Sequence, residues 1–558
     1  MATTLKANDP TAPASSTLRH VVLASSLGAL FEFYDFYLYG SLAAVIAKRF
    51  FSGLNETTAF ILTLLAFASG FLVRPFGSLV FGRLGDLVGR KQTFLVTLLL
   101  MGGSTFFVGC LPTRDAAGAA APVALVVLRM LQGLAIGGEY GGAATYVAEH
   151  VPPERRAYVT SWIQMTGSLG LMLSLIVILA CRYFTGADFD VWGWRIPFLL
   201  SSILLAVSMY IRLKLHESPV FEQLKRTGQV SRAPLREAFA NWANLKVVLL
   251  ALFGVTVGQA MVTYTSEIYA LYFITISLKI DAVTASTLLA VTLALGTPFS
   301  LLAGSLADRI GRKPVVLTGC LIAALTFLPI FHGLAHFGNP ALEAAVTHAP
   351  VVVRADPARC HLQFDPIGKT SFKTSCDVAK TYLAKAGVPY SNEAAAAGSV
   401  ARVGVGGAVV ASFEGESMSA AELGGARSDF NRRLGAQLAS AGYPATADPR
   451  AINVPGMLFL LTVLILYVSI VYGPLAAWLV EMFPPRIRYS AISLPYHLGF
   501  GWFGGFLPAI AFAIVARSGD IYGGLWYPII ASLASVAIGI ALVPETLKTR
   551  AAAWAGSA

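Results

Sequence analysis

The sequence predicts an all-α membrane protein in which twelve transmembrane helices form two pseudo-repeated six-helix halves. Three observations predict this fold class. Apolar residues make up 56% of the 558 residues and charged residues only 13%, about half the charged share of a soluble domain. The charges gather in short loops, which leaves apolar runs of the roughly 20 residues that cross a bilayer. One charged loop occurs twice, once in each half of the chain, and this repeat indicates an internal duplication.

The apolar runs predict twelve spans. They cover residues 21–47, 58–82, 93–111, 122–148, 159–181, 194–213, 246–274, 283–304, 315–337, 454–481, 491–516 and 522–543. The first run is interpreted as a retained span, because it is far longer than the core of a signal peptide and carries charges in its middle. With an even number of spans, both termini lie on one side of the membrane.

The basic residues predict that this side is the cytoplasm. With an internal N-terminus, the tails and the inside loops with their adjoining span ends hold 21 Lys and Arg, whereas the short outside loops with their adjoining span ends hold seven. Cytoplasmic loops carry such an excess, so the net charge of +11 is mostly a topology signal. The sequence has no exposed basic domain that would indicate nucleic-acid binding. We expect a multi-pass protein of the cell (inner) membrane that contacts the lipid bilayer and works as a monomer.

The repeated loop reads GRLGDLVGRK and, later, GSLADRIGRK, with six of ten positions identical. Asp86 and Asp308 are its equivalent acids, 222 residues apart. A second pair of acids, Glu149 and Glu481, is 332 residues apart. The 110 extra residues indicate an insertion between spans 9 and 10. The predicted units are 1–213 (first six-helix half), 214–245 (cytoplasmic linker), 246–337 (helices 7–9), 338–453 (extracytoplasmic insert) and 454–558 (helices 10–12 and tail).

The insert is predicted to be a small α+β domain rather than a disordered loop. Helices are expected near 375–386 and 427–441, each followed by a glycine, a common helix stop. Residues 403–413 could form one or two strands. Cys360 and Cys376 are the only cysteines outside the spans, and an oxidising compartment favours a disulfide between them. Metal binding together with His361 is the alternative, but that ligand set is incomplete, so we expect no metal.

Two carboxyl groups in the first span, Glu32 and Asp35, are candidates for proton coupling. They lie three residues apart, on one helical face, and ionisable groups inside a membrane by default suggest function. Burial raises the pKa of a carboxyl group, and a nearby cation lowers it. A carboxyl group balanced between these two effects can load a proton on one side of the membrane and release it on the other. A structural ion pair or polar contact with another span is the alternative.

Two arginines inside the spans could be partners of these acids. Arg129 could hold an anionic substrate through its planar fork, or neutralise the carboxylates of the first span. For Arg74, nearer the inner mouth, a structural pair is favoured, and Glu139 in a glycine-rich helix also needs a partner. The remaining polar candidates for a substrate cavity are Tyr34, Gln164, Gln259, Tyr264, Glu267 and His497. Each alone is more often an interhelical contact than a ligand.

The sequence contains no pattern that indicates an enzyme. It has no phosphate-binding loop of the Walker type, so ATP is not expected to drive the chain. G-x-S-x-G, H-E-x-x-H and paired C-x-x-C motifs are also missing from the sequence. We therefore expect no catalytic residues and no cofactor.

The repeated loop resembles the signature of the major facilitator superfamily, G-x-L-x-D-[RK]-x-G-R-[RK]. The second copy fits fully, whereas the first has Leu87 in the basic slot that Arg309 fills. Narrower motifs make the chain similar to the metabolite:proton symporter family, whose members carry α-ketoglutarate, citrate, shikimate, proline and betaine. These motifs are FEFYDF at 31–36, RPFG at 74–77, RMLQG at 129–133, GGEYGG at 137–142, SWIQ at 161–164, ESP at 217–219 and PET at 544–546.

The resemblance implies two six-helix halves that alternate access to a central cavity. It also implies an inner latch that holds the outward-open state. The latch residues would be Asp86, Arg90, Asp308 and Arg312, with Glu149, Arg156, Glu481 and Arg488 as possible partners. The expected function is proton-coupled import of a small organic anion, with a mono-, di- or tricarboxylate favoured. The alternatives are uptake of a zwitterion such as proline or betaine, export, and a receptor whose binding module is the insert.

Overall fold

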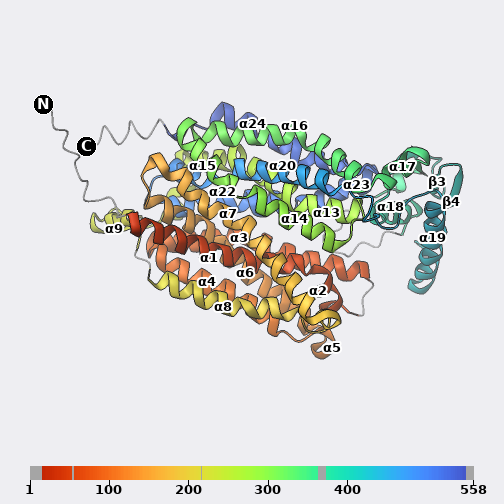
Figure 1. Ribbon diagram of the computed structural model, residues 1–558, viewed down its shortest axis with the longest axis horizontal. Coiled ribbons are helices and arrows are strands. Elements are labelled where there is room, and N and C mark those ends of the chain that lie inside the picture. The colour runs from red at the N-terminus through yellow and green to blue at the C-terminus, as the bar shows by residue number, and fades with distance from the viewer. Residues whose placement is uncertain (1–14, 53–55, 215–216, 362–372, 548–558) are drawn as a thin grey trace.

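A computed structural model describes residues 15–52, 56–214, 217–361 and 373–547. Two helical bundles lie side by side, and a small domain projects from one end of the second bundle (Figure 1). In the described ranges, ten helical segments are long and apolar enough to cross a membrane. The long helices α1 and α3 pack with them. The predicted fold class is confirmed, including the small insert that contains a sheet.

The N-terminal bundle contains six long helices, and four of them are longer than predicted. Its elements are α1 (Ser15–Ser41), α2 (Ala43–Phe50), α3 (Glu56–Leu87), α4 (Arg90–Cys110), α5 (Arg114–Ala117), α6 (Ala120–Glu149), α7 (Arg156–Thr185) and α8 (Arg195–Leu213). Because α3 continues to Leu87, the repeated Asp86 lies in its last turn rather than in a loop. Gly89, at φ 133°, follows the end of α3, and Gly311 has φ 114° in the second copy. This left-handed backbone explains the glycine that the two copies share.

The glycines of α6 let it lie directly against α3. A Cβ atom added to Gly133 would lie 2.1 Å from the carbonyl oxygen of Gly70. One added to Gly137 would lie 2.3 Å from the carbonyl oxygen of Arg74. Small residues permit this close backbone approach in membrane helices, and it brings Arg74 and Glu139 into the centre of the protein.

The C-terminal bundle repeats the arrangement with more irregular helices. Its seventh span runs as α11 (Trp242–Ala251), η3 (Leu252–Thr256), α12 (Val257–Tyr264), η4 (Thr265–Tyr269), α13 (Ala270–Tyr272) and η5 (Phe273–Ser277). The other spans are α14 (Ala282–Gly296) with α15 (Phe299–Ile310), α16 (Arg312–Gly338), α20 (Val454–Tyr472) with α21 (Leu475–Met482), α22 (Arg488–His497) with η7 (Leu498–Gly504) and α23 (Leu507–Ser518), and α24 (Trp526–Leu542). The short helices α9 (Pro219–Arg226) and α10 (Pro234–Phe239) connect the bundles. Segments η3, η4, η5 and η7 are π-helical, a form frequent at functional sites.

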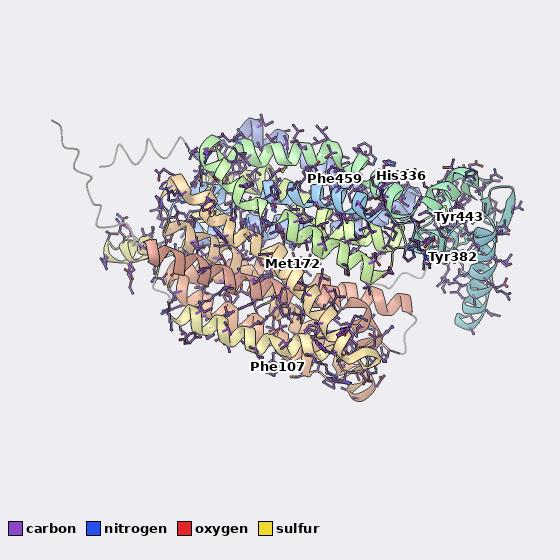
Figure 2. The ribbon with its side chains drawn as sticks, in the orientation of Figure 1. Phe107, Met172, His336, Tyr382, Tyr443 and Phe459 are labelled. Atoms are coloured by element: carbon purple, nitrogen blue, oxygen red, sulfur yellow. A yellow bond between two sulfur atoms is a disulfide. The ribbon has the colours of Figure 1, made fainter. Side chains whose placement is uncertain are left out.

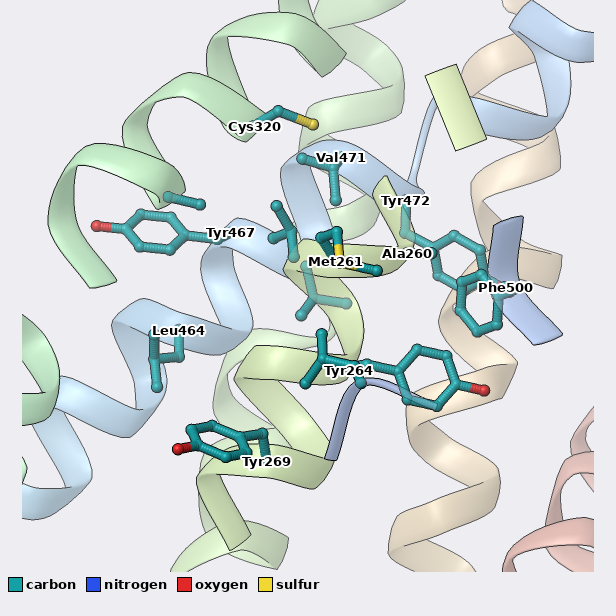
Figure 3. Packing of buried hydrophobic residues seen from close by; sticks show 14 of the residues in the cluster. Ala260, Met261, Tyr264, Tyr269, Cys320, Leu464, Tyr467, Val471, Tyr472 and Phe500 are labelled. Carbon is teal, nitrogen blue, oxygen red and sulfur yellow. The ribbon is translucent and has the colours of Figure 1, made fainter. Parts of the chain in front are cut away.

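The core of the C-terminal bundle forms where α12 meets α16 and α20. Met261 on α12 is fully buried near Val471 on α20 and Cys320 on α16 (Figure 3). On the outside of the bundles, large apolar side chains are exposed instead. Phe107 is 57% exposed and Phe459 is 66% exposed (Figure 2), as expected for residues that face lipid rather than water.

The insert folds around a four-stranded sheet with the order β2-β1-β3-β4. Its elements are α17 (Pro340–His348), β1 (Val351–Ala355), α18 (Ser375–Lys385), β2 (Ser391–Ala394), β3 (Arg402–Val405), β4 (Ala408–Ala411) and α19 (Ala420–Ser440). β1 pairs in parallel with β2 and antiparallel with β3, and β3 pairs antiparallel with β4. The predicted region 403–413 is thus a hairpin of two strands, while β1 and β2 were not predicted. The second helix begins seven residues before its predicted start, because Ser419 and Glu422 form a capping box.

The insert is anchored to the end of the C-terminal bundle. The amide of Asn392 donates to the carbonyl oxygen of Ser518 at 2.7 Å. Lys279, between η5 and α14, donates to the carbonyl oxygen of Pro444 at 2.8 Å. Burial lowers the pKa of Lys279 to about 8, because a charged ammonium loses water there. We call this end of the protein the insert end, and the opposite end, where α9 lies (Figure 1), the latch end.

Candidate functional site

At the latch end, Asp86 lies against the N-terminus of α22 in the other bundle. It accepts hydrogen bonds from the backbone N–H and the hydroxyl of Ser490 at 2.9 and 2.8 Å, where the helix dipole favours a negative charge. Arg90 lies 3.3 Å from Asp86 and 3.8 Å from Glu149. Arg488 pairs with Glu149 at 2.9 Å. These charges, the Asp86 cluster, join the two bundles.

The second copy of the repeat forms an equivalent cluster with the bundles exchanged. Asp308 accepts a hydrogen bond from the backbone N–H of Tyr158 at 2.8 Å, at the N-terminus of α7. Arg312 pairs with Asp308 at 3.0 Å and with Glu481 at 3.2 Å. Arg156 also pairs with Glu481 at 3.2 Å. The structure therefore brings all eight predicted gating residues together, in an Asp86 cluster and an Asp308 cluster.

Two further acids, which the gating prediction did not include, support the clusters symmetrically. Glu217 accepts from the backbone N–H of Arg90 at 3.1 Å, at the start of α4. Glu545 accepts from the backbone N–H of Arg312 at 3.3 Å, at the start of α16. In the described ranges Arg309 makes no ion pair, so the substitution by Leu87 in the first copy removes no charge contact that its counterpart makes.

We expect Asp86→Asn to open the latch end more readily than Asp308→Asn. Asp86 is buried and receives three hydrogen bonds from α22, whereas Asp308 receives two from α7. A hydrogen bond to a charged group contributes about 1.5–3 kcal/mol. The ratio of molecules open at the latch end to molecules closed there should therefore rise about tenfold or more in Asp86→Asn. The measurement is maleimide labelling of Ala143→Cys from the latch end, with Cys110, Cys181 and Cys320 replaced. Arg309→Gln is the control and should not change labelling. Equal labelling of the Asp86→Asn, Asp308→Asn and Arg309→Gln variants would contradict the latch.

Deep in the N-terminal bundle, Asp35 is connected to Arg129 through two polar side chains. Ser201 donates a hydrogen bond to Asp35, and Thr105 is its second hydroxyl neighbour. Gln132 donates to the Thr105 hydroxyl at 2.6 Å, and Arg129 donates to the Gln132 carbonyl oxygen at 2.7 Å. All five side chains are buried. A proton on Asp35 can thus influence the electrostatic environment of Arg129 without direct contact.

The two arginines both stack on the ring of Phe36. The guanidinium carbon of Arg129 is 5.0 Å from the ring centre of Phe36 and 4.4 Å from that of Tyr39. The guanidinium carbon of Arg74 is 4.2 Å from Phe36 and 4.5 Å from Phe71. These are cation–π distances, so the rings hold both guanidinium groups in place.

Glu139 is paired, but not with Arg74. Its partner is Arg212, at the latch end of α8, which lies 2.7 Å from Glu139 and 2.9 Å from Glu32. Thr97 donates a further hydrogen bond to Glu139 at 3.0 Å. Glu139 thus has the partner that its burial requires, whereas Arg74 stacks on Phe36 and Phe71 and has no ion pair among the described residues. Sequence reasoning counted Arg212 only as a loop charge.

A narrow cavity lies between the bundles, next to this triad of Glu32, Glu139 and Arg212. Its lining comes from both bundles and carries charges of both signs together with aromatic rings. It comprises Ala29, Glu32, Phe33, Arg74, Ile136, Glu139, Tyr140, Ala143, Ile163, Gln164, Tyr496, His497 and Phe500. The rings of Tyr140 and Tyr496 lie parallel, 3.4 Å apart, and Tyr472 stacks near Phe500 at 5.7 Å (Figure 3).

Of the predicted substrate-binding residues, Gln164 and His497 line this cavity and the others do not. Outside the described lining are Arg129, Tyr34, Gln259, Tyr264 and Glu267. Tyr34 donates to the carbonyl oxygen of Pro197 at 2.8 Å, and Gln259 donates to Thr263 at 2.9 Å within its own helix. Tyr34 thus has a partner on another helix, and Gln259 has one on its own helix.

In the insert, Cys360 and Cys376 are joined by a disulfide. His361, the residue considered for metal binding, forms a hydrogen bond with the carboxyl group of Asp377 at 2.8 Å. Over the residues that the structure describes, no cluster of three or more His, Cys, Asp or Glu could hold a metal ion.

The comparisons with known proteins agree with this geometry. The family model described as Major Facilitator Superfamily matches residues 25–343. The inner membrane metabolite transport protein YhjE of Escherichia coli K12 is 34% identical over 350 residues, which are 62% of this chain and 79% of YhjE. The proline/betaine transporter of the same strain is 32% identical over 326 residues, 56% of this chain and 64% of that protein, less than two thirds of its length.

Among solved structures, the proton:xylose symporter XylE bound to 6-bromo-6-deoxy-D-glucose is similar in fold. The TM-score is 0.59 at 17% identity, over 97% of this chain and 99% of XylE. At that identity the likeness shows the fold alone. The family model over residues 25–343 and the relatives above show that the chain belongs to the Major Facilitator Superfamily and, within it, to the metabolite:proton symporter family of membrane transporters, not enzymes.

Proposed function

We propose that the chain imports a small zwitterionic solute, such as proline or betaine, together with protons. The observation that carries this proposal is the charge balance of the cavity. Two carboxyl groups, Glu32 and Glu139, face two guanidinium groups, Arg74 on the lining and Arg212 behind it. A site without net charge suits a solute without net charge.

The lining also offers separate contacts for the two ends of such a solute. Arg74 can bind a carboxylate through its planar fork. The faces of Tyr140, Tyr496 and Phe500 can hold a quaternary or secondary ammonium group by cation–π attraction. A relative at 32% identity is named a proline/betaine transporter, which supports this choice over the organic anion expected from the sequence. That expectation rested on Arg129, which the cavity lining does not include.

Asp35, with Glu32, is the proposed proton-coupling group, and the latch clusters hold the outward-open state. The 21 basic residues of the tails and of the inside loops with their adjoining span ends, and the inner membrane named for the relative YhjE, support a latch end in the cytoplasm of an inner-membrane protein. The insert then lies outside. Proton binding on that side and substrate binding near Arg74 allow the bundles to rock, provided that substrate binds the two states differently.

The test is uptake by the purified protein in proteoliposomes with an acidic exterior. We expect labelled betaine or proline to accumulate, and a protonophore to abolish the accumulation because it removes the proton gradient. Arg74→Leu should lower apparent affinity, and Arg309→Gln is the matched control on an exposed arginine. Acid-driven uptake of citrate or α-ketoglutarate that excess betaine does not inhibit would reject the zwitterion and support the organic anion.

A further inference from the structure

A row of polar side chains on α7 contacts the C-terminal bundle at three levels. Ser161 donates to the carbonyl oxygen of Gly473 at 3.0 Å. Gln164 donates to the carbonyl oxygen of Tyr472 at 2.9 Å. Ser168 donates to a carboxyl oxygen of Glu267 at 2.5 Å. The spacings of three and four residues place these side chains on one helical face, and we call the three contacts the α7 seam.

Glu267 is the one titratable partner among the three contacts of the seam, and it lies at the contact nearest the insert end. Only 2% of the residue is exposed. Its titratable neighbours are tyrosines on three elements: Tyr37 on α1, Tyr264 on α12 and Tyr472 on α20. In the ranges that the structure describes, no Lys, Arg or His forms an ion pair with Glu267. Arg74 is the cation that interacts with all three tyrosines: it hydrogen-bonds to Tyr264 and stacks on Phe36 and Phe71.

A buried carboxylate with one hydroxyl donor and no cation is costly, because a single neutral hydrogen bond does not replace its hydration. The neutral acid is far cheaper to bury in the same place. While the seam is closed, Glu267 is therefore expected to carry a proton. When the bundles separate at the insert end, the Ser168 contact is the first of the three to break, and water can then stabilise the carboxylate.

We propose that Glu267 is a second proton-binding group of the transporter, and that the seam closes only when this group is protonated. Water at the open insert end supplies the proton, which adds to the carboxylate to form the neutral acid. Closure then removes the acid from water with its Ser168 contact made. This inference rests on the proposed proton coupling and deepens it, since it ties a protonation to a contact between the two bundles.

Substrate counterflow at equal pH on both sides tests the proposal without a proton gradient. Asp35→Asn removes the main proposed coupling group, and Glu32 keeps its ion pair with Arg212. Counterflow in that variant should still fall at alkaline pH, by roughly tenfold per pH unit beyond the titration of Glu267. Adding Glu267→Gln, which keeps a neutral side chain at every pH, should make the profile flat within about twofold from about pH 6 to about pH 9. Identical profiles for the single and double variants would overturn the proposal.

Two serine variants test the contact even if the glutamine variant does not fold. Ser168→Ala should slow counterflow at acidic pH, because the closed state loses a contact between the bundles. Ser174→Ala is the matched control: Ser174 is buried on the same helix, but its hydroxyl donates to Leu171 of that helix at 2.8 Å. Equal rates for both variants would refute the seam. If the proposed proton coupling itself were wrong, the result would differ from failure of the Glu267 proposal. Wild-type protein would then show counterflow but no accumulation driven by a pH gradient.

Discussion

Asp35→Asn is expected to abolish accumulation of substrate driven by a pH gradient while exchange of substrate across the membrane continues. Asparagine has nearly the shape of the acid and stays neutral at every pH, so the transporter can close but can no longer bind and release a proton at this position. The structure gives this residue a polar path of two side chains, Thr105 and Gln132, to Arg129. Loss of the proton from Asp35 adds a negative charge at one end of this path.

The measurement compares acid-driven uptake with counterflow in the same proteoliposome preparation. We expect uptake by Asp35→Asn to fall by at least about a hundredfold, near the level of empty vesicles, because one obligatory proton step is removed. Asp190→Asn is the matched control, since Asp190 lies in a loop at the insert end with surface partners Lys48 and Arg182. Undiminished acid-stimulated accumulation in Asp35→Asn would refute the assignment.

The repeat, together with the resemblance to the major facilitator superfamily, predicts which residues lie at the latch end. Charges in short loops between spans can reach only the nearby helix ends, so Asp86 and Asp308 have few possible partners. The same spacing in both halves then predicts that the two clusters are equivalent. The structure adds Glu217 and Glu545, which lie outside the repeated loop but cap the helices that start with Arg90 and Arg312.

The interior is harder to predict, because contacts there depend on which faces of several helices meet. Arg212 follows an apolar run and reads as a loop charge, yet the packing of α8 turns it inward toward Glu32 and Glu139. Arg129 was predicted as a substrate ligand, yet it donates a hydrogen bond to Gln132 on its own helix and does not line the described cavity. In the insert, β2 is fully exposed and has no alternation of apolar residues, so only its pairing with β1 defines it as a strand.

The second large effect is expected for Arg212→Gln, which removes the one cation between two buried carboxyl groups. Arg212, Glu32 and Glu139 are 2%, 3% and 5% exposed. Breaking a buried ion pair from one side costs about 3–5 kcal/mol, because the remaining charge stays buried without compensation. Glutamine can donate one hydrogen bond but supplies no charge. We expect a marked fall in the thermal stability of the purified protein and loss of transport.

Adding Glu139→Gln to Arg212→Gln distinguishes two causes of the lost stability, an uncompensated buried charge and lost packing. The double variant has one buried carboxyl group fewer than Arg212→Gln, so it should regain part of the lost stability even though it carries two substitutions. Arg182→Gln is the control on a surface ion pair with Asp190, worth about 0–1 kcal/mol. If the double variant were less stable than the wild-type protein by the sum of the two single effects, the three residues would not act as one electrostatic unit. Partial recovery would mean that the uncompensated negative charge, rather than the lost side-chain volume, destabilises the single variant, and that Arg212 sets the charge balance on which the zwitterion proposal depends.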